Sequence, residues 1–184
     1  MTRVLVTGFE PWGSHEVNPS QLLAERLGGV VLPVSYGRAA AALRAAIAET
    51  EPDAVVAFGL ADDRRAISIE RFAHNLDEAS TTDNDDAAGS GAEIEPGAPL
   101  ALATGLPADE IAAALRAEGL PAEISRDAGG FLCNHVFYVL LRSLDGGRIG
   151  GFVHVPPLAV LPLERLALAG RVIVSACERH ISPS

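Results

Sequence analysis

Lysine is absent from this chain of 184 residues, so all 14 basic residues are arginine. The 24 acidic residues bring the formal net charge to -10, and such a surface repels phosphate backbones, which makes nucleic-acid binding an unexpected function. Cysteine occurs only as Cys133 and Cys177, too few for a disulfide framework. No apolar run approaches the ~20 residues of a membrane helix, and Val4–Val6 is too short for a secretory h-region. We therefore expect a soluble, reduced, cytoplasmic protein that does not bind membranes.

The apolar residues that are present form short segments, alternately strand-like and helix-like. They make up 48% of the chain, enough for the buried core of one domain over residues 1–184. The predicted strands are 3–7, 30–34, 53–58, 67–72, 121–125 and 149–155, and the predicted helices are 19–27, 37–49, 107–118, 133–144 and 163–179. This alternation predicts an α/β fold, a three-layer αβα sandwich around a mostly parallel twisted sheet. In such folds the functional site lies at the carboxyl ends of strands.

Cys133 stands at one predicted turn from strand to helix. The polar segment 125–127 leads into Gly129 and Gly130, and glycines there allow positive φ and a close approach of the backbone to another group. A thiol in the first helical turn lies at the positive end of the helix dipole, which lowers its pKa and favours a thiolate nucleophile. The same pattern also fits a buried core cysteine, which is the expectation for Cys177 in the last helix.

A thiol nucleophile needs a base and a group that orients the base. The base candidates are the five histidines, His15, His74, His135, His154 and His180. His154 interrupts an apolar strand, where a polar side chain needs a partner, whereas His135 points away from Cys133 on the same helix. Glu70 would orient the imidazole in a Cys-His-Glu arrangement. A hydrogen-bonded core histidine and a surface ion pair of Glu70 with Arg71 are the structural alternatives.

No metal site is expected. Structural zinc takes four ligands, usually as two close pairs, and Cys133 and His135 have no second pair. The acidic run 83–86 lacks the spacing of a calcium-binding EF-hand. The segment from Asp77 to Ala92 therefore reads as a long solvated loop, a kind of segment that often forms a lid.

Four blocks of the sequence resemble the pyroglutamyl peptidase type I (pyrrolidone-carboxylate peptidase) family. They are VLVTGFEPWG with VNPS at the amino end, AISIER around Glu70, AGGFLCNHVFY around Cys133 and GFVHVP around His154. The blocks occur in the family's order and at compatible separations, which is more specific than any single motif. The resemblance implies the doubly covered α/β fold and a cytosolic cysteine peptidase without metal or cofactor.

Carried over to matching positions, the resemblance implies that Cys133 is the nucleophile, His154 the general base and acid, and Glu70 the orienting carboxylate. The positions that it implies for the pocket of the pyroglutamyl ring are Phe9, Trp12, Asn18, Phe131 and Leu132. It also implies peptides with an amino-terminal pyroglutamyl residue as substrates, hydrolysis through a thioester, and a homo-oligomer, either dimer or tetramer.

The sequence departs from the family pattern at Ser80, in the turn Asp62-Asp63-Arg64, and by shorter segments over 30–37 and after Pro157. Ser80 stands where the family has an arginine near its active site, in the segment that follows Glu70. A weakened peptidase is one expectation from this change. The alternatives are a thiol hydrolase of another cyclic or acyl amide, and a non-catalytic protein that binds pyroglutamyl peptides.

Overall fold

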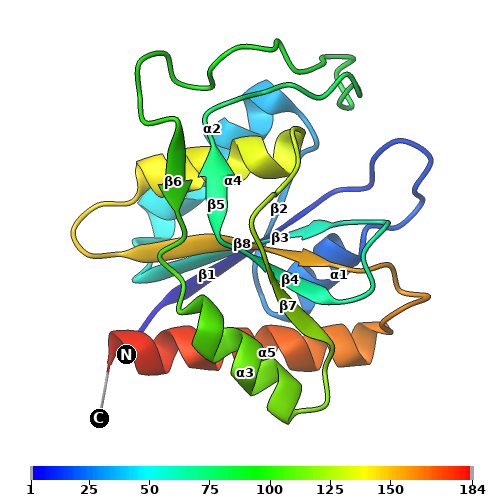
Figure 1. Cartoon of the computed structure of the whole chain (residues 1–184), viewed down its shortest axis with the longest axis vertical. Coiled ribbons are helices and arrows are strands. Elements are labelled where there is room, and N and C mark those ends of the chain that lie inside the picture. Colours follow the sequence, from blue (N-terminus) through cyan, green and yellow to red (C-terminus); the bar gives the residue numbers. More distant parts are fainter. Residues whose placement is uncertain (1, 183–184) are drawn as a thin grey trace.

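A six-stranded sheet forms the centre of the computed structural model, which describes residues 2–182 (Figure 1). The strands are β1 (Val4–Phe9), β2 (Val30–Leu32), β3 (Ala54–Leu60), β4 (Ile67–Glu70), β5 (Phe72–His74), β6 (Ala101–Ala103), β7 (Ala122–Ser125) and β8 (Ile149–Val155). The helices are α1 (Pro19–Arg26), α2 (Tyr36–Thr50), α3 (Ala108–Ala117), α4 (Leu132–Ser143) and α5 (Leu163–Ile181). Strands β5 and β6 form a separate two-stranded sheet.

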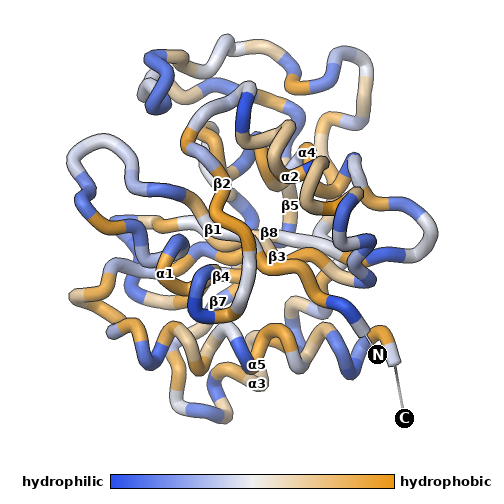
Figure 2. The backbone as a smooth tube through the Cα atoms, turned by 180° about the vertical axis from the view of Figure 1, so that it is seen from behind, coloured by the Kyte–Doolittle hydropathy of each residue, from blue (hydrophilic) through white to orange (hydrophobic). Residues whose placement is uncertain are grey.

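The helices cover both faces of the main sheet and give the predicted three layers. Apolar side chains of α1, α3 and α5 pack in one core cluster, and those of α2 and α4 pack in a second. Figure 1 shows α3 and α5 below the sheet and α2 and α4 above it. Hydrophobic residues are concentrated along the central strands (Figure 2). Cys177 lies in the first cluster with no exposed surface, which confirms its expected place in the core.

The strand order is β2-β1-β3-β8-β4-β7. It creates a crevice at the carboxyl ends of β1 and β3, the part of the sheet where a functional site is predicted from the sequence. Strand β1 is parallel to β2 on one side and to β3 on the other, so the order of strands reverses at β1. Ligands of open α/β sheets bind outside the carboxyl ends of strands at such a reversal. Phe9 ends β1 and Leu60 ends β3, and both line the pocket described below.

Two predictions about the strands are wrong in detail. The extended segment predicted over 67–72 is divided between β4 and β5, which belong to different sheets. Strand β4 is antiparallel to β8 and parallel to β7, so β7 runs against the main direction. The carboxyl end of β7 therefore lies away from the crevice, and residues 126–131 bring the chain back to α4. The sheet remains mostly parallel, as predicted.

Candidate active site

Two glycines set the start of α4, the helix that carries Cys133. Gly129 has φ +80 and donates its N–H to Oδ1 of Asp127 at 2.8 Å. Gly130 lies close to another backbone segment, since its carbonyl accepts from the N–H groups of Glu78 and Ala79 at 3.2 and 3.0 Å, and a Cβ there would lie 2.7 Å from Cγ of Glu78, which would have to move. Both predicted reasons for the glycine pair are present. Cys133 follows as the second residue of α4, in the first turn.

The sulfur of Cys133 lies against the backbone of β3. A Cβ on Gly59 would lie 2.9 Å from Sγ of Cys133 and 2.7 Å from Cζ of Phe152. Gly59 is paired with His154 in the register of β3 and β8, and the rings of Phe152 and His154 are 4.9 Å apart. The missing side chain of Gly59 thus gives the thiol its space beside the strand position of His154.

His154 and Glu70 form a buried pair on the same side of the sheet. Nδ1 of His154 lies 2.7 Å from Oε1 of Glu70, and the two residues are 4% and 0% exposed. On β4, Ile67 and Ile69 pack in the opposite core cluster, so side chains along this strand alternate between the two faces of the sheet. Because Nδ1 faces the carboxylate, Nε2 is the ring nitrogen available for proton exchange.

Burial controls the resting state of the thiol. It raises the pKa of Cys133 to about 12, the negative charge of Glu70 acts in the same direction, and the positive charge of Arg64 opposes both. The expectation of a lowered thiol pKa is therefore wrong, because desolvation of the thiolate in this apolar setting has the largest effect on the pKa. A thiol with a raised pKa needs a base to become a thiolate.

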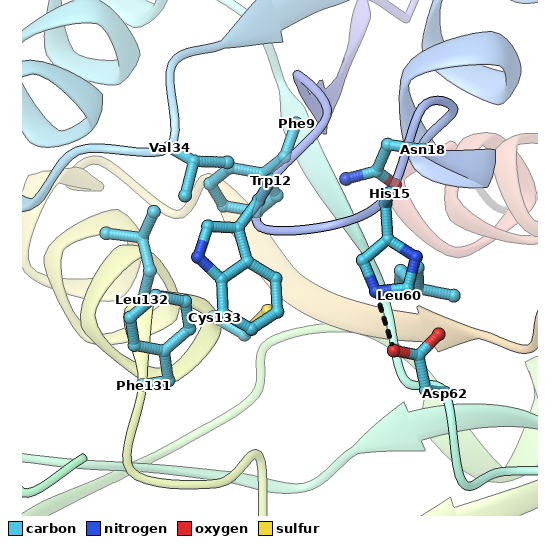
Figure 3. A pocket seen from close by; sticks show the side chains of 10 residues that line it. All are labelled: Phe9, Trp12, His15, Asn18, Val34, Leu60, Asp62, Phe131, Leu132 and Cys133. Atoms are coloured by element: carbon cyan, nitrogen blue, oxygen red, sulfur yellow. Dashed lines mark ion pairs between the residues drawn. The ribbon is translucent and has the colours of Figure 1, made fainter. Parts of the chain in front are cut away.

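An apolar pocket opens beside the sulfur, and Figure 3 shows its lining. The ring of Trp12 lies over that of Phe131 with centroids 5.0 Å apart. The full lining consists of Phe9, Trp12, His15, Asn18, Val34, Leu60, Asp62, Phe131, Leu132 and Cys133. The cavity measures about 60 Å³, several times the roughly 10–15 Å³ that one water needs. It has room for a small ring, and all five predicted pocket residues line it.

Asn18 lines this pocket and also fixes the loop that forms it. Its Oδ1 accepts hydrogen bonds from N and Oγ of Ser20, at 3.0 and 2.8 Å, as the predicted N-cap of α1. Its Nδ2 donates to the carbonyl of Glu10 at 3.0 Å. The side chain therefore ties the end of β1 to the start of α1.

The segment from Asp77 to Ala92 supports the tryptophan wall of the pocket. Nε1 of Trp12 donates to the carbonyl of Thr82 at 2.9 Å. Asp83 is 5% exposed, and its carboxylate accepts from the N–H groups of Tyr36, Asp85 and Ala87. The prediction of a solvated loop is therefore wrong at Asp83. Burial alone would raise the pKa of Asp83, but the three backbone donors outweigh it and place the pKa below its ordinary value.

The other histidines that were weighed as bases have different partners or lie elsewhere. Nδ1 of His135 lies 2.8 Å from Oδ2 of Asp77, and His180 lies near Glu110. His74 is exposed on β5. His15 pairs with Asp62 across the pocket, Nε2 to Oδ2 at 2.9 Å (Figure 3).

Several residues of the site were not found by sequence reasoning. The pocket is also lined by Val34, Leu60 and Asp62, from loops or strand ends, and only the rule about carboxyl ends of strands pointed to their region. His15 was predicted only as a possible base and not as part of the pocket. Arg64 contacts Glu70 in the interior, although Arg71 was the arginine considered as its partner. The side chain of Arg71 instead contacts Asp109.

Within residues 2–182, no group of three or more His, Cys, Asp or Glu side chains is arranged to hold a metal ion. Over the same range, no helix combines the length and the apolar composition that crossing a membrane requires.

Comparisons with known proteins point to a single family. The family model described as pyroglutamyl peptidase matches residues 2–169. The pyrrolidone-carboxylate peptidase of Gloeobacter violaceus is 48% identical over 168 residues, covering 85% of this chain and 82% of that protein. Its namesake from Pyrococcus furiosus is 39% identical over 188 residues, covering 95% and 90%. A crystal structure of the Bacillus amyloliquefaciens pyroglutamyl peptidase I has a TM-score of 0.94 at 33% identity and covers 98% of both chains.

Proposed function

The chain belongs to the pyroglutamyl peptidase family, and on this premise we propose that it hydrolyses the amide bond after an amino-terminal pyroglutamyl residue. Cys133 is the nucleophile, His154 the general base and acid, and Glu70 the carboxylate that orients His154. The observation that carries this assignment is the position of the Cys133 sulfur, which lies beside Gly59, the strand partner of His154, and lines the apolar pocket.

The reaction begins with proton transfer from the thiol of Cys133 to Nε2 of His154, because the surroundings raise the pKa of this thiol. The sulfur attacks the pyroglutamyl carbonyl carbon, and the carbonyl oxygen becomes an oxyanion. The backbone N–H of Cys133, in the first turn of α4, is a natural donor to this oxyanion. The imidazolium then protonates the leaving amine as the C–N bond breaks, which leaves a thioester. Water, deprotonated by His154, hydrolyses the thioester and restores the thiol.

The pocket explains selection of the pyroglutamyl ring by size and charge. Trp12, Phe131 and Leu132 offer apolar surfaces to a compact uncharged lactam. An ordinary amino terminus carries an ammonium group, which is costly to bury among apolar side chains. The apolar walls therefore favour the uncharged ring over an ordinary amino terminus.

A pyroglutamyl anilide assay tests the proposal. We expect release of the aniline by the parent protein, and loss of at least about 10³-fold in kcat for Cys133→Ser, since the hydroxyl is a far weaker nucleophile in this setting. Cys177→Ser is the matched control, because Cys177 lies in the core away from the pocket, and its kcat stays at the parent value once folding is verified. A parent protein that binds the anilide without cleaving it contradicts the peptidase assignment.

Ser80 is the one observation that favours the alternative functions. Ala79, its neighbour, donates its N–H to the carbonyl of Gly130 at 3.0 Å, so a long cation at position 80 starts close to the turn before Cys133. Higher kcat for Ser80→Arg but not for Ser80→Gln would identify a weakened pyroglutamyl peptidase. Turnover of other cyclic or acyl amides in preference to pyroglutamate would identify a different thiol hydrolase.

The partners of the protein follow from the same proposal. Its substrates are peptides with an amino-terminal pyroglutamyl residue, and the negative net charge argues against nucleic acid as a partner. Both cysteines are free thiols, which suits a reducing, cytoplasmic location. A homo-oligomer, dimer or tetramer, remains a prediction that light scattering of the purified protein checks.

A further inference from the structure

Glu70 has a second cationic partner besides His154. Nη1 of Arg64 lies 2.5 Å from Oε1 of Glu70, the same oxygen that faces Nδ1 of His154 at 2.7 Å. The other oxygen, Oε2, is buried without a hydrogen-bond partner among residues 2–182. The completely buried carboxylate of Glu70 thus depends on two donors at one oxygen, and Arg64 supplies one of them.

The charge of Arg64 suits the role of Glu70 in the pair. A carboxylate with no exposed surface is costly to ionise unless a positive charge lies beside it, and a neutral imidazole supplies none. An ionised Glu70 accepts the Nδ1–H of His154 and so keeps Nε2 free as a base. Arg64 therefore provides the charge that keeps Glu70 an acceptor while His154 is neutral.

The other charged groups near this cluster are engaged elsewhere. Arg71, next to Glu70 in sequence, contacts Asp109, and Glu123 of β7 accepts from Ser68 at 2.8 Å. Asp62, in the same loop as Arg64, pairs with His15. Within the described residues, Arg64 is the only arginine in an ion pair with Glu70.

The second arm of the guanidinium reaches the turn that carries the nucleophile. Nη2 of Arg64 donates to the carbonyl of Asp127 at 2.8 Å, and the Asp127 side chain caps Gly129 at the start of the turn to Cys133. The planar fork of an arginine makes both contacts at once, which the single ammonium of a lysine does not. The side chain of Arg64, 20% exposed, therefore links the Glu70–His154 pair on β4 and β8 to the turn before Cys133.

We propose that Arg64 is a positioning residue of the peptidase reaction, which holds Glu70 as an ionised acceptor for His154 and fixes the turn before Cys133. The inference rests on the proposed function. Arg64 does not line the pocket, so its effect is on the chemical step and not on recognition of the ring. Its charge also opposes the effect of burial and of Glu70 on the pKa of the Cys133 thiol.

Kinetics of Arg64→Met and Arg64→Lys test the proposal, with Arg65→Met as the matched control on an exposed neighbour. We expect Arg64→Met to lower kcat about 10²-fold, the scale of a small misplacement of reacting groups, with KM nearly unchanged. Arg64→Lys keeps the charge and loses the fork, so its kcat lies between that of Arg64→Met and the parent value. Arg65→Met keeps the parent kcat. Equal kcat in all four proteins overturns the proposal.

A second measurement does not depend on peptide cleavage. The rate of Cys133 alkylation by iodoacetamide, followed from pH 7 to 10, reports the thiolate fraction, and we expect Arg64→Met to need a higher pH than the parent for the same rate. A parent protein that fails to cleave while this shift appears overturns the proposed function and leaves the role of Arg64 standing. Cleavage by the parent with no shift and no loss in kcat overturns the role of Arg64 alone.

A double-mutant cycle separates positioning from general loss of stability. In a Glu70→Gln background the buried charge is gone, so Arg64→Met folds without an unpaired carboxylate. If Arg64 acts through Glu70, its substitution costs much less kcat there than in the parent background. Equal costs in both backgrounds, with folding verified by thermal melts, contradict action through Glu70.

Discussion

At the residue scale, the sulfur of Cys133 occupies the space that a side chain at position 59 of β3 would need. The Cβ position of Gly59 is 2.9 Å from the sulfur and 2.7 Å from the Phe152 ring, both shorter than ordinary contacts between heavy atoms. Phe152 is completely buried and cannot move without disturbing the core. The sulfur lies at the open pocket, so it is the atom that moves when this volume is filled.

Gly59→Ala tests this constraint. We expect a loss of kcat of about 10²-fold, because the added methyl group displaces the sulfur from its position beside residue 59, the strand partner of His154. Overpacking costs about 1–3 kcal/mol of stability, which a thermal melt measures separately. Gly37→Ala in α2, where a Cβ meets nothing within 4 Å, is the control and retains the parent kcat. Full activity of Gly59→Ala would show that the thiol does not need this space.

Residues recognised from the sequence differ in kind from those that were missed. Cys133, His154 and Glu70 stand in segments where local pattern makes a polar or reactive side chain conspicuous, and the family resemblance joins them. Arg64 and Gly59 are missed because their roles are distances to residues far along the chain. Local pattern contains no information on such distances, and a thiol pKa raised by burial depends on them as well.

At the scale of the element, the loop over 77–92 is a support and not only a solvated excursion. Its buried Asp83 accepts from the N–H of Tyr36 at the start of α2, and its Thr82 carbonyl accepts from Trp12 in the pocket wall. An acidic composition predicts exposure, yet three backbone donors gather around one carboxylate. The loop therefore connects the start of α2 to Trp12 in the pocket wall through hydrogen bonds at Asp83 and Thr82.

Asp83→Asn tests that link. Nδ2 of the amide cannot accept, so at least one of the three N–H donors loses its partner, at a cost of about 1–3 kcal/mol. We expect KM for a pyroglutamyl anilide to rise several-fold while kcat changes little, and hydrogen exchange over 77–92 to accelerate. Asp86→Asn makes the same charge change on an exposed side chain and leaves KM unchanged. Parallel behaviour of the two variants would refute a supporting role for Asp83.

Protonation of Asp83 at low pH should have the same effect as the Asp83→Asn substitution. The pKa of Asp83 lies below its ordinary value, so the folded state favours the charged form. The stability from this group is then fully present above the unfolded pKa of about 3.9 and is lost as the pH falls through the lower folded value. The link therefore persists at neutral pH.

The elements themselves were largely predictable from the sequence. Asn18 and Pro19 begin α1, β8 spans its predicted range of 149–155, and Gly129 with Gly130 precedes α4. The direction of β4 was not predicted, since alternation along a strand gives its faces and not its neighbours. The pairing of β5 with the short, partly exposed β6 likewise depends on tertiary contacts.

At the scale of the whole molecule, the absence of lysine simplifies the alkaline titration. Only two cysteines and two tyrosines remain as side chains with ordinary pKa values between 8 and 11. Burial raises the pKa of Tyr138 and, together with Asp77 and Asp83, that of Tyr36, from 10.0. Between pH 9 and 10 both the thiols and the tyrosines lose protons in the unfolded chain, so the contribution of one thiol is measured by comparison with a variant that lacks it.

Cys177 should consequently make folding sensitive to alkali. Burial, more than the charge of Glu178, raises its pKa from 9.0 to about 12, so the folded state binds a proton that the unfolded state releases. The stability that this group contributes is complete below pH 9 and is lost as the pH rises toward 12.

Urea unfolding of the parent and of Cys177→Ala between pH 8 and 10.5 measures this effect. Above pH 9 the free energy of unfolding of the parent falls with pH, and the slope for Cys177→Ala is flatter by up to about 1.4 kcal/mol per pH unit, the value for one proton. The variant is less stable at every pH because the core loses the sulfur atom, so the comparison rests on slopes and not on absolute values. Equal slopes would mean that the Cys177 thiol ionises as readily in the folded protein as in the unfolded chain, which is incompatible with its complete burial on the core side of α5.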